Sequence, residues 1–93
     1  MELEQLRIFL AVAEEHSFSG AARRLFVSHS TTSRAVSALE RELDTPLFLR
    51  AGKAVEPTPA GDILKEKAKE LLELAEKAKE AVQTAKKEKP PHE

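Results

Sequence analysis

Hydrophobic positions that recur every three or four residues predict three short helices in the first half of the chain. Segment 3–15 is apolar on almost every side, which suits a helix buried between others, and segment 18–25 follows directly after Ser17. Segment 27–43 has one apolar and one polar side, and Ser28 can cap its N-terminus. Two short helices joined by a tight turn, with the second polar on its outer side, are typical of a helix-turn-helix unit.

The residues after the third helix predict a small β-hairpin and then one long helix. Segments 47–50 and 54–56 are strand candidates around a turn at 51–53, and Thr58-Pro59 is a strong helix start. Strong helix formers then continue to about residue 87. We therefore predict a mainly α fold, a winged helix-turn-helix in which a three-helix core carries a small β-hairpin wing. Its expected divisions are the winged helix-turn-helix over 1–58, a long helix over 59–87 and a flexible tail over 88–93.

The polar side of segment 27–43 is the first candidate for a functional site. It carries hydroxyls and arginines, with no acidic residue before Glu40. Short donors and arginine near a helix N-terminus suit contacts with the DNA major groove. In the alternative interpretation, Arg34 pairs with an acid such as Glu40, and Ser30, Thr31 and Ser33 are merely tolerated at the surface. Clustered hydroxyl residues lower helix propensity, however, and DNA contacts would offset that cost.

Spacings of four and three also run along the last predicted helix and indicate a coiled-coil seam of three heptads. The segment is too long to pack wholly on a three-helix domain, so we expect it to pair with a second copy of the chain. Its first residues, Ile63 and Leu64, are instead expected to pack on their own domain. The predicted dimerisation residues are Leu64, Ala68, Leu71, Ala75, Ala78 and Val82.

Composition limits the classes of function. The chain has 93 residues, no cysteine and a formal net charge of −1, whereas a small nucleic-acid-binding domain is usually basic. DNA affinity must therefore come from local clustering of charge. The longest apolar run, 8–13, is too short to span a bilayer, and Glu2 and Glu4 lie where an export signal needs positive charge. We expect a cytoplasmic protein without a membrane partner. The three histidines lack metal-ligand spacing, and no catalytic residues or cofactor are predicted.

One set of residues matches a known pattern without a gap in spacing: Leu6, Phe9, Ala13, Glu14, Ser17, Phe18, Ser19, Ala21, Ala22, Leu25, Val27, Ser28, Ser33, Arg34, Leu39, Glu40, Glu42, Leu43, Leu47, Phe48, Arg50, Gly52, Thr58, Ala60 and Gly61. This pattern as a whole resembles the N-terminal DNA-binding region of LysR-type transcriptional regulators. The resemblance implies a winged helix-turn-helix, a dimerising linker helix and an interrupted-palindrome DNA site. Such regulators continue into a larger effector-binding domain, so the chain is expected to be a fragment or a natural truncation. A full-length protein could form a higher oligomer.

Five positions depart from the pattern of that family. The family often has Gln-Pro where this chain has His29-Ser30, so its base preference is expected to differ. Lys53 stands where the wing commonly carries arginine, Asp44 replaces a usual glycine, and Pro57 removes a strand donor and is expected to shorten the wing. With the wing residues that the resemblance adds, the predicted DNA-binding residues are Ser28, His29, Ser30, Thr31, Ser33, Arg34, Ser37, Arg50 and Lys53.

Three functions can be compared from the sequence. The first is a sequence-specific transcription factor that binds an inverted repeat in double-stranded DNA as a homodimer. The second is a protein-interaction module that no longer binds DNA, which the near-neutral charge favours. The third, an enzyme, lacks any nucleophile–base pair or carboxylate pair in the sequence. A steep loss of DNA affinity with salt would separate the first from the second. Arg7, Arg23 and Arg24 are either phosphate contacts or ordinary surface charges.

Overall fold

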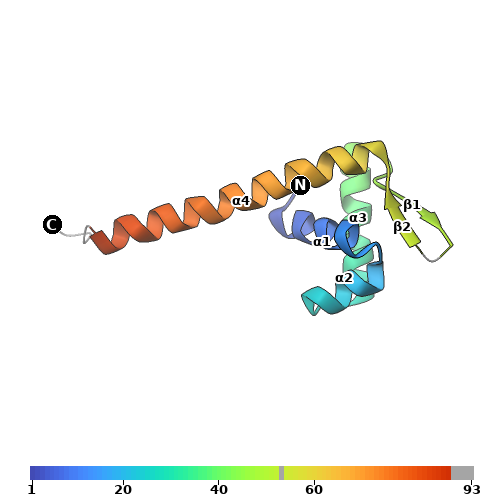
Figure 1. The fold of residues 1–93 in the computed structure, drawn as a ribbon, viewed down its shortest axis with the longest axis horizontal. Helices are drawn as coiled ribbons and strands as arrows, with labels where there is room; N and C mark the ends of the chain where they lie inside the picture. Colours follow the sequence, from blue (N-terminus) through green and yellow to red (C-terminus); the bar gives the residue numbers. More distant parts are fainter. Residues whose placement is uncertain (53, 89–93) are drawn as a thin grey trace.

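A computed structural model describes residues 1–52 and 54–88 and shows a small helical domain from which one long helix extends (Figure 1). The fold class is confirmed, and the first two helices have the predicted bounds. The third helix begins at His29, two residues after the start of the predicted segment 27–43, because Ser28 is its N-cap. The predicted turn residue Lys53 and the tail residues 89–93 lie outside the described residues. The elements are α1 (Leu3–Glu15), α2 (Phe18–Leu25), α3 (His29–Leu43), β1 (Phe48–Ala51), β2 (Ala54–Pro57) and α4 (Pro59–Glu88).

Serine caps and left-handed residues define where the short helices begin and end. The Ser17 hydroxyl accepts a hydrogen bond from the Gly20 amide at 2.9 Å, and the Ser28 hydroxyl accepts one from the Thr31 amide at 3.0 Å. The C-terminal caps of α1, α2 and α3 are His16, Phe26 and Asp44, with φ values of 55°, 58° and 54°. The chain therefore reverses direction sharply after each helix, which brings α1, α2 and α3 together.

The core lies around α1, whose Leu6, Phe9 and Val12 are fully buried. Helices α2, α3 and α4 all pack against it. The Phe9 ring lies 5.2 Å from that of Phe48 on β1, and Phe48 also contacts Phe18 at 6.0 Å between ring centroids. Through Phe48, the base of the wing is anchored in the same core as the helices.

The wing is an antiparallel hairpin whose register runs from the pair Phe48–Pro57 to the pair Ala51–Ala54. Pro57 is the last residue of β2 and stands opposite Phe48, so the expectation that it shortens the wing stays a prediction. In a two-stranded sheet both strands are edges, so a residue at the strand end that lacks an N–H is tolerated. The wing projects from the end of the domain at which α4 begins (Figure 1).

The start of α4 is attached to the segment between α3 and β1. The Thr58 hydroxyl donates to the Pro46 carbonyl at 2.8 Å and accepts from the Gly61 amide at 3.0 Å, and the Thr58 amide donates to the Leu47 carbonyl. A Cβ atom on Gly61 would overlap with that Leu47 carbonyl oxygen. The close approach therefore requires glycine at this position.

Helix α4 continues far beyond the domain (Figure 1), and residues of its first three turns belong to the core. Leu64 is 8% exposed and Ala68 is 0% exposed within a single chain. The expectation that Leu64 packs on its own domain is confirmed, and Ala68 is buried there too. Because their own domain covers these side chains, they offer little surface to a partner, and their place in a dimer seam stays a prediction. Ile63, which was expected to pack on the domain, is 64% exposed. None of the described helices combines the length and the hydropathy that crossing a bilayer requires.

Candidate nucleic-acid interface

Most of the DNA-binding residues predicted in α3 lie on its outer side and are exposed to solvent. His29, Ser30, Arg34 and Ser37 are exposed, and Ser33 is half-buried. Within the described residues, Arg34 forms no ion pair. Its suggested partner Glu40 instead accepts a hydrogen bond from the Leu47 amide at 2.8 Å. The guanidinium of Arg34 is therefore available to an external acceptor.

The first turn of α3 is held by its own hydroxyl groups. The Ser28 hydroxyl, which caps the helix, also donates to the Thr31 hydroxyl at 2.8 Å and lies 3.3 Å from that of Ser30. The Thr32 side chain is fully buried and donates to the Ser28 carbonyl at 3.1 Å. These bonds fix the position of the helix N-terminus, where free amides and the helix dipole favour an anionic partner. The DNA contacts assigned to Ser28 and Thr31 stay predictions.

Phe18 brings the wing and the start of α3 together. The Arg50 guanidinium lies 4.4 Å from the centroid of the Phe18 ring, a cation–π contact, and the His29 ring lies 6.2 Å from the same ring. Ser19, His29, Arg50 and Gly52 line a notch of about 160 Å³ beside Phe18. Phe18 is not among the predicted DNA-binding residues, because nothing in the local sequence indicates its contact with Arg50. The start of α2, the start of α3 and the wing thus meet on one side of the domain.

The arginines of α1 and α2 differ in whether their guanidinium groups are free to contact DNA. Arg24 pairs with Glu14 at 2.8 Å and with Glu15 at 3.3 Å. The hydrogen bond to Glu14 is the main cause that raises the pKa of Arg24. Arg7 pairs with Glu4 at 2.9 Å. Arg23 is exposed and forms no ion pair with the described residues, so it is the best placed of the three for a phosphate contact.

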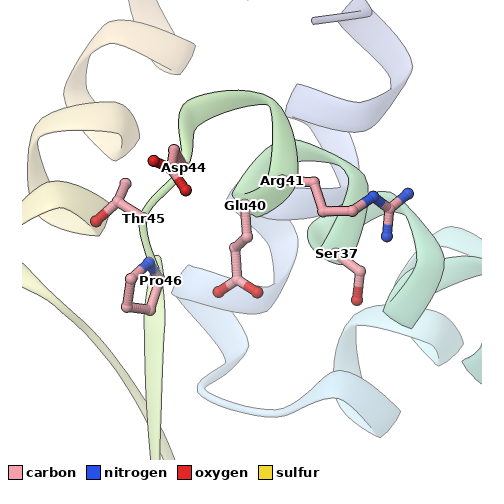
Figure 2. Close-up of a pocket in the computed structure, with 6 residues that line it drawn as sticks. All are labelled: Ser37, Glu40, Arg41, Asp44, Thr45 and Pro46. Carbon is pink, nitrogen blue, oxygen red and sulfur yellow. The ribbon is translucent and has the colours of Figure 1, made fainter.

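Acidic residues gather at the opposite end of α3. Figure 2 shows a hollow there with Glu40 and Asp44 among its lining residues, and with the Arg41 side chain directed away from both. Glu40 and Asp44 would repel phosphate close by, whereas the preceding part of α3 carries no acid. The charge distribution therefore favours the N-terminal half of α3 as the part that approaches DNA.

Comparison with protein families identifies the class of this fold and site. The family described as "Bacterial regulatory helix-turn-helix protein, lysR family" matches residues 3–62, from the first residue of α1 to the first turn of α4. The chain belongs to this family of bacterial regulators, which confirms the resemblance inferred from the sequence.

One similar curated protein is "HTH-type transcriptional regulator TfdS" from Cupriavidus pinatubonensis (strain JMP 134 / LMG 1197). It is 46% identical over 74 residues, which cover 80% of this chain and 25% of the relative. The chain thus spans about a quarter of the length of this relative.

Solved structures with the same fold include protein–DNA complexes. "Crystal structure of CbnR_DBD-DNA complex" matches with a TM-score of 0.88 and 39% identity, over 91% of this chain and 98% of that one. "Crystal Structure of BenM_DBD/catB site 1 DNA Complex" matches with a TM-score of 0.87 and 35% identity, over 91% and 94% of the two chains. These matches confirm the winged helix-turn-helix architecture.

Proposed function

We propose that this chain is the sequence-specific DNA-binding part of a LysR-type transcriptional regulator. A homodimer inserts its two α3 helices into successive major grooves, and each wing lies near the adjacent minor groove. The DNA site is then an inverted repeat whose half-sites are separated by one helical turn or a multiple of it. The divisions 1–58 for the DNA-binding domain and 59–87 for the linker helix are part of this proposal.

The observation that carries the proposal is the exposed, acid-free N-terminal half of α3. His29, Ser30 and Arg34 offer hydrogen-bond donors there without competing ion pairs among the described residues. Arginine can bind a guanine edge through two hydrogen bonds or bind a phosphate. The CbnR and BenM structures, which are DNA complexes of domains similar to this one, support the same assignment.

The dimer is supported by the part of α4 that leaves the domain. Leu71, Leu74 and Val82 are large apolar side chains in solvent, and Leu74 is 63% exposed. Spacings of three and four residues place them with Ala78 on one side of the helix, so a second copy can cover them. Ala75 is half-buried in the single chain and lies at the margin of this side. The exposed stripe of Leu71, Leu74, Ala78 and Val82 differs from the predicted seam. It includes Leu74 and does not include Leu64 or Ala68.

The alternative of a protein-interaction module draws support from the net charge of −1. The local distribution of charge weakens it, because the acids at Glu14, Glu15 and Glu4 are paired with arginines away from α3. We propose no catalytic activity, in keeping with relatives that are transcriptional regulators. A regulator of bacterial chromosomal DNA works in the cytoplasm, which is the location we propose.

The salt dependence of DNA binding tests the proposed function. The affinity of the purified chain for duplex DNA should fall linearly with the logarithm of salt concentration, with a slope of about −0.9 for each phosphate contacted. Arg23→Ala should reduce the steepness of that slope by about one if Arg23 binds a phosphate. Affinity that is absent at low salt, or independent of salt, would contradict DNA binding and favour the interaction module.

A further inference from the structure

His29 is the first residue of α3, and contacts on two sides restrain its ring. Its Nδ1 atom lies 3.5 Å from the Ser33 hydroxyl one turn further along the helix, and either atom can donate in this long contact. The Phe18 ring lies 6.2 Å away on the other side, with the Arg50 guanidinium stacked on that same ring. The opposite ring nitrogen, Nε2, has no hydrogen-bond partner among the described residues. One nitrogen therefore faces a protein hydroxyl and the other is free for a ligand.

We propose that Ser33 holds His29 as an outward-facing donor that selects guanine in the DNA site, an inference that rests on the proposed function. The Ser33 hydroxyl donates to Nδ1 of the neutral ring, so the proton of the imidazole resides on Nε2. When the ring is protonated, Nδ1–H donates to the same hydroxyl and Nε2–H is unchanged. The atom presented to DNA is thus a donor in both charge states.

The chemistry of the base edges explains why a single outward donor selects guanine. Guanine presents two adjacent acceptors in the major groove, N7 and O6, whereas adenine places an amino donor beside its N7. An N–H group placed between N7 and the neighbouring exocyclic group faces the amino donor in adenine. In guanine the same N–H group faces two acceptors, N7 and O6. Glutamine carries both a donor and an acceptor and matches adenine instead. His29 and Ser33 together therefore determine one base pair in each half-site.

The tautomer of His29 can be tested on the free protein by NMR. At a pH where its own titration shows the ring to be neutral, correlations between ring protons and nitrogens should show the proton mainly on Nε2. Comparison with His29→Gln identifies the signals of this histidine. Ser33→Ala should increase the share of the Nδ1–H form, and Ser33→Thr, which keeps a hydroxyl, should restore the Nε2–H form. The proposed hydrogen bond from the Ser33 hydroxyl to His29 Nδ1 would be overturned if the wild-type ring carried its proton mainly on Nδ1. It would also be overturned if Ser33→Ala left the spectrum unchanged.

Selection from random duplex DNA tests the base preference with the same variants. The wild-type pool should show guanine at one position of each half-site, and His29→Gln should change that position to adenine, with a preference of about tenfold in each case. The remaining positions should stay the same. This inference would be overturned if His29→Gln selected the same motif as the wild type. It would also be overturned if Ser33→Ala changed the motif only at a different position. Both results would leave the proposed function intact. A wild-type pool without any motif would contradict both.

Discussion

The substitution Arg34→Ala separates DNA recognition from folding, because Arg34 is exposed and forms no ion pair with the described residues. Its removal leaves no charge unpaired, and alanine is the better helix former. The free energy of unfolding should therefore change by less than about 0.5 kcal/mol, as is usual for such surface positions. Specific DNA binding should lose about 1–3 kcal/mol, which corresponds to a rise in Kd of roughly 5- to 150-fold.

The assay for Arg34→Ala is a fluorescence-anisotropy titration of a duplex that carries the selected site, in parallel with thermal unfolding. Arg7→Ala is the matched control, because Arg7 is also an exposed helical arginine but is engaged by Glu4 at 2.9 Å. That variant should bind with the wild-type Kd. Wild-type affinity in Arg34→Ala would remove Arg34 from the site. A large drop in the melting temperature would show that the side chain has a structural role that its exposure does not indicate.

Three further substitutions test the dimer stripe, the start of α4 and the wing. Leu74→Asp should shift the chain from dimer to monomer in sedimentation analysis, whereas Lys69→Asp, on another side of α4 by helical spacing, should not; a dimeric Leu74→Asp would place the seam elsewhere. Gly61→Ala should destabilise the fold by about 1–3 kcal/mol in denaturant unfolding, because its Cβ would overlap with the Leu47 carbonyl oxygen; unchanged stability would refute that close contact. Lys53→Ala should weaken binding with little change in sequence preference; a changed motif would contradict the role assigned to the wing.

Local signals in the sequence were sufficient to predict the helices and their ends. Ser17, Ser28 and Thr58 are capping residues whose hydroxyls act on amides three residues away, so their effect is visible in a short window. Proline at 59 and the absence of later breakers likewise define the start and the length of α4.

Contacts between distant segments could not be predicted in the same way. A heptad pattern shows which side of α4 is apolar, but it does not show whether the side is covered by the same chain or by a partner. Leu64 and Ala68 proved to be core residues for that reason, while Leu74 proved to be exposed. The meeting of Phe18, His29 and Arg50 depends on how the wing folds back on α2, which no local spacing encodes.

The most direct test of the central claim is selection of random duplex DNA on the purified chain at near-physiological salt, followed by sequencing of the bound pool. Recognition by a symmetric pair of α3 helices predicts an inverted repeat with half-sites one helical turn, or a multiple of it, apart. An enriched single half-site would contradict the dimer on DNA. A pool without enrichment would contradict sequence-specific recognition by α3.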